Sequence, residues 1–261
     1  MPHDTATGRV RLVGAGPGAA DLLTVRALRA IEGAQALLYD ALISTEVLAL
    51  APAACLKIQT GKRAGRTSMK QQTINKLMLR LARSGLEVVR LKGGDPSIFG
   101  RVGEEREFLQ THGVAVEVVP GVTAACAAAA QFGFPLTHRG EARRLLISTA
   151  TVAGGEFLDA SRAGAADPET TLALYMGRDQ VQAIADRLIR QGRPAATPAI
   201  AVENAGHPDA RGIPSTLGEL AAVLDAARPT GPVILLIGDV TARAECATVV
   251  GAASTPRRAS A

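Results

Sequence analysis

The stretch from Val88 to Glu105 reads VVRLKGGDPSIFGRVGEE, and the fold of the chain is best understood from it. Its apolar start predicts a buried strand, the run GGDP at 93–96 breaks that strand, and the charged end predicts a helix. Adjacent glycines permit positive φ and let backbone lie close to a ligand, while a proline keeps the residue before it extended. Open α/β sheets build binding crevices with this succession, although an ordinary strand-to-helix connection would read the same way.

Composition limits the classes of protein to consider. The chain has 261 residues, of which 47% are hydrophobic, enough for one large domain or two ordinary ones with a substantial core. The net charge of +5 suits nucleic acid, a membrane surface or a polyanionic small molecule. Because no run of five or six basic residues occurs, we expect no nucleic-acid partner.

Several absences in the sequence favour a cytoplasmic protein. The 3 cysteines are widely spaced without a CxxC pair, which indicates reduced thiols. The 4 histidines form no metal-binding pair, so we expect no metal site. No apolar run is long enough to span a membrane, and the first residues, MPHDTATG, do not resemble a signal peptide.

The first half of the chain alternates strand and helix patterns. Helices are predicted over residues 24–32 and 71–84, with Thr24 or Asp21 as the cap of the first. The predicted strands are 9–13, 35–39, 56–58, 88–91 and 114–118. This alternation predicts an α/β unit with a largely parallel sheet, and the apolar runs of the last two strands fit burial on both faces.

The second half begins with a helix of small residues, TAACAAAAQF, at Thr123. Further helices are predicted near 180–190 and 216–227. The predicted strands are 145–148, 171–175, 198–203 and 233–238. We place a domain boundary near Gly121, which gives domains 9–121 and 122–243 and a disordered tail at 244–261.

The glycine run GAGPGA at 14–19 also matches the dinucleotide-binding pattern GxGxxA, with Asp40 at a suitable distance for a ribose. Two features weigh against an NAD-linked dehydrogenase. Pro17 stiffens the turn, and the predicted helix begins only at Asp21 or Thr24. A displaced helix loses the contact between its amides and the pyrophosphate.

A series of motifs resembles the tetrapyrrole methyltransferase family. The motifs occur in the family's order over about residues 9–240. They are VGAGPG with DLLT, YDALIS, GKRAG, VVRLKGGDPSIFGRVGEE, VVPGVTAA, PLTHR, YMG and VEN. A lone GxGxG would be a weak signal, whereas the combination of GKR, LKGGDP, IFGR and PLTHR is specific.

The resemblance implies a two-domain α/β fold with a parallel-sheet N-terminal domain, a mixed-sheet C-terminal domain and the cofactor in the cleft between them. It implies a homodimeric enzyme that uses S-adenosyl-L-methionine to methylate uroporphyrinogen III at two ring carbons, giving precorrin-2 and S-adenosyl-L-homocysteine. Alternatives left open are methylation of a later precorrin or of an RNA base, and cofactor binding with little turnover.

By the same resemblance, a set of residues in both halves is expected to contact the cofactor. They are Pro17, Gly93, Gly94, Asp95, Ile98, Thr123, Ala124, Met176 and Ala205. Glycines let the backbone approach the cofactor, and a carboxylate suits its ammonium group or ribose hydroxyls. Thr123 could instead be a helix cap, and Met176 could simply fill the core.

The catalytic expectations also rest on the resemblance. Asp40 matches a proposed proton acceptor and Lys62 a proposed donor, because a proton must leave the methylated ring. Arg101 is an alternative base or substrate clamp, and a binding role is favoured because guanidinium stays protonated.

The substrate implied by the resemblance carries eight carboxylates. Arg63, Arg101, Arg139 and Lys92 are therefore sensible partners through charge-assisted hydrogen bonds. Glu104 could accept a hydrogen bond from a pyrrole N–H, although it could also lie on a solvated helix face.

The chain departs from the family pattern at several positions. Ser97 and Val102 replace the usual Phe and Gly, and Ala205 stands where the family has glycine after VEN. The segment 148–151 reads STAT and lacks the usual histidine. These departures motivate the alternative of little turnover.

Overall fold

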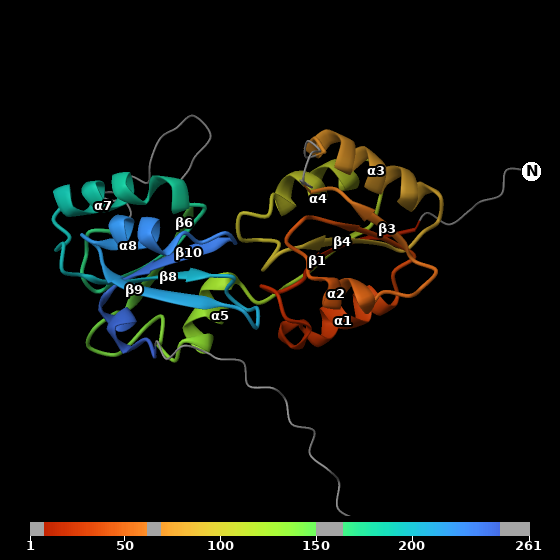
Figure 1. The fold of residues 1–261 in the computed structure, drawn as a ribbon. Coiled ribbons are helices and arrows are strands. Elements are labelled where there is room, and N and C mark those ends of the chain that lie inside the picture. The colour runs from red at the N-terminus through yellow and green to blue at the C-terminus, as the bar shows by residue number, and fades with distance from the viewer. Residues whose placement is uncertain (1–7, 62–68, 150–163, 246–261) are drawn as a thin grey trace, which may run out of the picture. The chain divides into compact units, whose positions relative to one another are not determined.

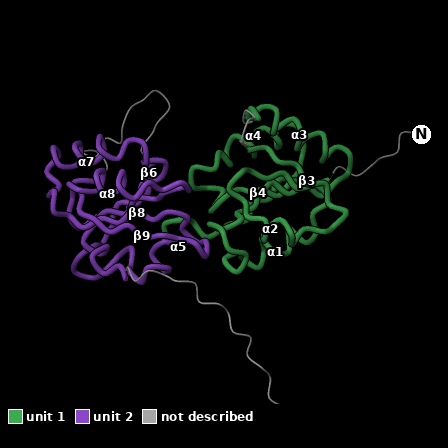
Figure 2. The backbone as a smooth tube through the Cα atoms, in the orientation of Figure 1, with its two compact units in different colours: residues 1–127 green, residues 128–261 purple. Residues whose placement is uncertain are grey.

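The computed structural model describes residues 8–61, 69–149 and 164–245, and its chain forms two compact units (Figure 2). Unit 1 comprises residues 1–127 and unit 2 residues 128–261, so the division falls inside the helix Ala124–Gln131. The predicted site residues Lys62 and Arg63 and nearly all of the predicted tail lie outside the described residues.

Among the described residues of unit 1, five strands form one sheet in which every neighbouring pair is parallel. In spatial order they are β3 (Leu56–Gln59), β2 (Ala36–Tyr39), β4 (Val88–Lys92), β1 (Val10–Gly14) and β5 (Val116–Val119). The prediction of a parallel sheet is therefore confirmed, and each predicted strand of this half is present within two residues of its expected bounds.

Helices cover both faces of this sheet (Figure 1). On one face lie α1 (Val25–Glu32) and α2 (Thr45–Ala49), and on the other α3 (Gln71–Arg83) and α4 (Val102–Thr111). Side chains alternate along β1, since Val13 packs with the α1–α2 core and Leu12 with the α3–α4 core. Burial on both faces explains why the strands are apolar without strict alternation. The short helix α2 was not predicted.

The central strands β1 and β4 lead to helices on opposite faces of the sheet, α1 and α4. In open α/β sheets such a point opens a crevice at the carboxyl ends of the strands, where ligands bind. The glycine stretches 14–18 and 93–94 follow these two strands.

Unit 2 contains a mixed sheet, as predicted. In spatial order its strands are β6 (Arg144–Thr149), β7 (Thr170–Tyr175), β10 (Val233–Ile237), β8 (Pro198–Glu203) and β9 (Arg211–Thr216). Among the described strands of this unit, only β6 and β7 pair in parallel, and the other pairs are antiparallel. The helices α7 (Val181–Arg190) and α8 (Leu220–Ala227) share a core with β7, β8 and β10, while α5 (Ala124–Gln131) lies over the other face (Figure 1).

The edge strand β9 corrects one prediction. The helix expected from Thr216 begins only at Leu220, because Thr216 is still paired with Pro198 in the sheet. Pro214 lies inside β9, and a proline is tolerated there because it has no backbone N–H to donate and an edge strand is paired on one side only. None of the described helices is long and apolar enough to cross a bilayer.

Candidate functional site

Two glycine loops are joined by their backbones at the carboxyl edge of the unit 1 sheet. Gly16 and Gly94 form an isolated antiparallel bridge, in which Gly94 N donates to Gly16 O at 2.7 Å and Gly16 N to Gly94 O at 3.2 Å. Ala15 N also donates to Lys92 O at 2.9 Å. The loops that follow β1 and β4 are therefore held side by side beyond the ends of their strands.

A third loop, after β5, packs against both of them through glycine. A Cβ atom on Gly121 would lie 2.3 Å from Gly94 O and 2.9 Å from Gly14 Cα, distances that real Cβ atoms do not show. A Cβ atom on Gly14 would meet Gly94 O at 2.7 Å. Only glycine allows this approach, so the three loops converge through their backbones.

The carboxylate of Asp95 fastens the second loop to the third. Its Oδ1 accepts a hydrogen bond from Ser97 N at 2.7 Å, and its Oδ2 accepts one from Gly121 N at 2.9 Å. Each carboxylate oxygen can accept more than one hydrogen bond, so Asp95, which is half-buried, keeps capacity for a ligand donor.

The first loop is tied to the third through Thr24. Its Oγ1 accepts from Ala27 N at 3.1 Å as the cap of α1 and donates to Pro120 O at 3.2 Å. A short 3-10 helix, Ala20–Leu22, separates the glycines from α1. The free amides at the N-terminus of α1 therefore lie beyond the glycine run. They are not placed to bind the pyrophosphate of a dinucleotide.

The turn carrying Asp40 lies beside the second loop. Asp40 follows β2 and its Oδ1 accepts from Leu42 N at 3.1 Å, while a Cβ atom on Gly93 would meet Leu42 Cβ at 3.5 Å. A Cβ atom on Gly61 would lie 2.3 Å from Ala41 N, so Gly61 also packs closely on this turn.

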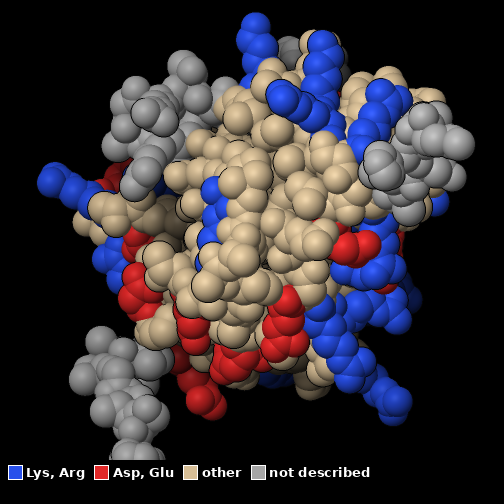
Figure 3. All heavy atoms as spheres, turned by 90° about the vertical axis from the view of Figure 1, so that its right-hand side faces the viewer, with Lys and Arg blue, Asp and Glu red and all other residues tan. Residues whose placement is uncertain are grey.

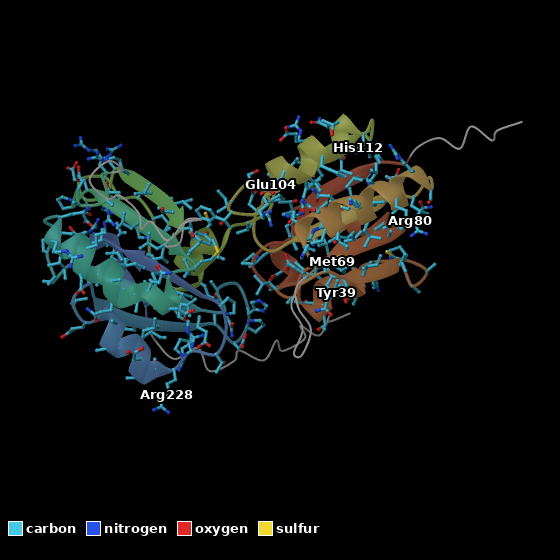
Figure 4. The ribbon with its side chains drawn as sticks, turned by 90° about the horizontal axis from the view of Figure 1, so that it is seen from above. Tyr39, Met69, Arg80, Glu104, His112 and Arg228 are labelled. Atoms are coloured by element: carbon cyan, nitrogen blue, oxygen red, sulfur yellow. The ribbon has the colours of Figure 1, made fainter. Side chains whose placement is uncertain are left out.

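The predicted residues Lys62 and Arg63 follow Gly61 in the sequence, and the chain is described again from Met69. Met69 N donates to Thr60 O at 3.2 Å, and Thr60 N donates to Tyr39 O at 2.8 Å. Figure 4 shows Tyr39 and Met69 near each other on this side of unit 1. The described chain therefore stops at Gly61 and resumes at Met69 beside the end of β2.

Strained backbone coincides with the predicted site segments. Phe99, Arg101, Met176 and Asn204 have φ between 52 and 57°, a left-handed conformation that costs non-glycine residues about 1–3 kcal/mol. Arg228, at the end of α8, is a further such residue. Arg101 and Met176 were predicted as site residues, and Asn204 directly precedes Ala205. Strain of this kind concentrates where side chains must be presented to ligands.

Glu104, which is labelled in Figure 4, lies in the first turn of α4 and is paired with Arg101. Arg101 Nε and one terminal nitrogen donate to the two Glu104 oxygens at 2.8 and 2.7 Å. The hydrogen bond to Glu104 raises the pKa of Arg101, and the same bond lowers the pKa of Glu104. Both side chains are more than half exposed, so solvent and salt screen the pair.

Lys92, which the sequence suggested as a substrate partner, is buried and paired with a glutamate of α4. Its residue is 5% exposed, and its ammonium donates to Glu105 Oε2 at 2.8 Å. Burial lowers the pKa of Lys92, partly opposed by the negative charges of Glu105 and Asp40. The sequence does not show this pairing, because the alternation of a buried strand does not reveal which helix residue faces its last side chain.

Three of the predicted site residues belong to unit 2, namely Met176, Ala205 and Arg139. Met176 follows β7, is 59% exposed and precedes Gly177, and Ala205 follows β8 and is buried. Because β7 and β8 both run antiparallel to β10, their carboxyl ends share one edge of the unit 2 sheet. Arg139 is exposed in the turn before β6, closed by the bridge of His138 with Ala142.

The remaining predicted cofactor residues lie at or near the three converging loops of unit 1. Pro17 belongs to the first loop, Ile98 follows the second, and Thr123 and Ala124 connect the third loop to α5. The sequence missed Gly14 and Gly121 as close-packing residues, although both belong to motifs it singled out.

Neither charged surface nor metal-binding side chains indicate a further site in the described part of the chain. Basic and acidic side chains both occur on the face of unit 1 drawn in Figure 3, with uncharged surface between them. No group of three His, Cys, Asp or Glu side chains that could hold a metal ion occurs in the described part of the chain.

Comparison with known proteins gives consistent matches. The family model of tetrapyrrole (corrin/porphyrin) methylases matches residues 9–221. Over 238 residues the chain is 47% identical to a uroporphyrinogen-III C-methyltransferase of Paracoccus denitrificans, covering 91% of this chain and 83% of that protein. It is 45% identical over 235 residues to a siroheme synthase of Azotobacter vinelandii, covering 90% of this chain but only 50% of the relative's length.

Among solved structures, the chain is similar to the uroporphyrin-III C-methyltransferase from Thermus thermophilus in complex with S-adenosylhomocysteine. The TM-score is 0.78 at 43% identity, and the match covers 90% of this chain and 99% of that one.

Proposed function

This chain belongs to the tetrapyrrole (corrin/porphyrin) methylase family, and we propose that it methylates uroporphyrinogen III at two ring carbons with S-adenosyl-L-methionine, giving precorrin-2 and S-adenosyl-L-homocysteine. The observation that carries the proposal is the convergence of three glycine-bearing loops after β1, β4 and β5. It places the partly exposed residues 93–95 and 121–123 at the position in the sheet where α/β proteins bind small ligands.

The residues of these loops fit the cofactor. Gly94 has φ +67°, and a Cβ atom there would lie 3.8 Å from Thr123 Cα, so the second loop brings no side chain between itself and the start of α5. Asp95 keeps acceptor capacity for an ammonium or hydroxyl donor. When bound, the cofactor supplies an electrophilic methyl group on its sulfonium.

We assign cofactor contact to residues in both units. They are Pro17, Gly93, Gly94, Asp95, Ile98, Thr123, Ala124, Met176 and Ala205. Their part is to orient the cofactor and exclude water, since positioning of reactants can supply up to about 7–11 kcal/mol of a barrier.

For the substrate we propose charge-assisted binding of its carboxylates by Arg63, Arg101 and Arg139. Arg101 is held by Glu104 in the described structure, and a substrate carboxylate would replace Glu104 as its partner and free Glu104 to accept a pyrrole N–H. Asp40 is proposed to accept the proton that leaves the methylated ring, with Lys62 as the proton donor.

We further propose a cytoplasmic homodimer, on the family resemblance and on cysteines that suit a reducing compartment. Light scattering of the purified protein measures the mass in solution, and a monomer at micromolar concentration would contradict the dimer.

The activity is tested by incubating the protein with S-adenosylmethionine and uroporphyrinogen III without oxygen. The expected product is heavier by two methyl groups, and S-adenosylhomocysteine should form in twofold amount. A parallel incubation with later precorrins is the control for substrate choice. Unchanged uroporphyrinogen mass together with methylation of a later precorrin would overturn the proposed substrate, and no methylation of any of them would overturn the proposed activity.

A further inference from the structure

A buried group of charges beneath the site has no part in the proposed chemistry. Arg90 and Lys92 project from β4, and Glu105 from α4, with residue exposures of 5, 5 and 0%. Glu105 accepts from Lys92 Nζ at 2.8 Å through one oxygen and lies 3.5 Å from Arg90 Nε through the other. Two cations and one anion are thus enclosed together, in surroundings where charges are costly to keep.

The group links three elements that lead to predicted site residues. Gln71, the first residue of α3, donates from Nε2 to Glu105 Oε1 and to Asn75 Oδ1, both at 2.9 Å. The end of β4, the start of α3 and the first turn of α4 therefore meet at one carboxylate. Gly93 follows Lys92 directly, and Arg101 directly precedes α4.

The Lys92 side chain also packs under the strained turn 99–101. A Cβ atom on Gly100 would lie 3.1 Å from Lys92 Cε and 2.4 Å from Pro96 O. Phe99 and Arg101, on either side of Gly100, are both left-handed. Glu104 accepts from Arg101 in this turn, and its neighbour Glu105 accepts from Lys92, which packs against the turn.

Stability alone does not account for such a group. Replacing a buried ion pair with apolar side chains of similar volume is often neutral or stabilising, whereas the pair demands one geometry. A strained turn persists only where its surroundings over-determine it, and the Lys92–Glu105 pair supplies that constraint.

We propose that Lys92 and Glu105 are positioning residues, which hold the turn 99–101 in the conformation that presents Arg101 to the substrate. The expected effect on catalysis rests on the proposed function, whereas the expected effect on the conformation of the turn does not. The turn should depend on the pair even in the absence of any ligand.

The test uses Lys92→Met, which keeps the length of the side chain without its charge and leaves Glu105 paired with Arg90. The double variant Lys92→Met/Glu105→Gln also removes the carboxylate, so that Arg90 is the one charge left in the group. Leu109→Ala is the matched control, because Leu109 is a fully buried core residue one helical turn after Glu105 in α4 and outside the ion group. Hydrogen exchange of a peptide covering 96–103 is measured without ligand, followed by steady-state methylation and S-adenosylhomocysteine binding.

We expect at least tenfold faster exchange of the 96–103 amides in both Lys92 variants than in Leu109→Ala. We expect kcat/KM for uroporphyrinogen III to fall at least tenfold, with S-adenosylhomocysteine affinity within threefold of the wild type. Exchange equal to that of Leu109→Ala would overturn the inference whatever the activity. An inactive wild type would instead count against the proposed function and leave the exchange result to decide the inference.

Discussion

Glycine 121 is the residue at which the three loops come closest. We expect Gly121→Ala to destabilise the fold by about 1–3 kcal/mol or more, because its methyl group would overlap Gly94 O and force backbone apart. Gly103→Ala is the control, since a Cβ atom on that exposed residue of α4 would meet nothing within 4 Å. This control should gain up to about 0.5–1 kcal/mol. Urea unfolding measures both, and equal effects of the two variants would contradict the close approach.

Glu203 predicts a pH dependence of stability. Burial alone would raise the pKa of Glu203, but hydrogen bonds from Gly231 N, Thr230 N and Arg211 outweigh it and hold the pKa below its usual value. Since the folded pKa is the lower one, the stabilisation is complete above the unfolded pKa of about 4.3 and is lost as pH falls through the folded pKa.

The variant Glu203→Gln should therefore be less stable than the wild type at pH 7, by about 1–3 kcal/mol. The difference should shrink as the pH is lowered below about 4.3, because the wild type loses its carboxylate there. Urea midpoints between pH 7 and 3 measure it. A constant difference across that range would show that Glu203 does not titrate with folding.

Residue-scale prediction from the sequence succeeded where a residue type has one clear use. The glycines at 93–94 and 14–18 indicated loops that follow strands, and the two loops are joined there by backbone hydrogen bonds. It did not anticipate the buried pairing of Lys92, because a lysine at a strand end suggests a solvated side chain unless its partner is known. The pairing with Glu105 arises from the packing of α4 on β4, which local pattern does not encode.

At the scale of elements, the cap of α1 also serves the site. Thr24→Ala removes the bond to Ala27 N and the bond to Pro120 O, and should cost about 0.5–2 kcal/mol. Thr24→Ser keeps the hydroxyl and should retain most of the stability. Thermal unfolding of both variants measures the difference, and equal losses would mean that the lost methyl group, rather than the hydroxyl, sets the cost.

Strong periodicity made most elements predictable. The amphipathic helices α3 and α7 begin and end close to their expected bounds, because each buries one apolar stripe. Strand β9 was missed because RGIPST has little apolar alternation and contains a proline, and its pairing depends on the edge of β8. Helix α2 was missed because its five residues are too few to show a helical repeat of apolar positions.

At the scale of the whole molecule, ligand binding should stabilise the folded chain. With S-adenosylhomocysteine at 100 times its Kd, we expect about 2.7 kcal/mol of added stability, and none with NAD. Asp95→Ala should reduce the gain at the same ligand concentration, because it loses a ligand acceptor and the tie to Gly121. Asp225→Ala, an exposed carboxylate of α8, is the control. An undiminished gain in Asp95→Ala would remove Asp95 from the site.

The sequence motifs anticipated the two-sheet architecture because most of them lie at the end of a strand, PLTHR at 135–139 being an exception. Two α/β units, one with a parallel and one with a mixed sheet, were predicted and found. The order of strands could not be derived from periodicity, which says nothing of neighbours. The placement of β1 between β4 and β5 depends on how the connections cross the sheet.

That strand order has a consequence during synthesis. Val10 pairs with Val88 and Val116, which are synthesised 78 and 106 residues after it. At about 5–20 residues per second, the interval is several seconds to over ten, during which an apolar segment lacks both neighbours. β1 therefore stays without a sheet partner until β4 has been synthesised, and its apolar surface is open to wrong contacts during that time.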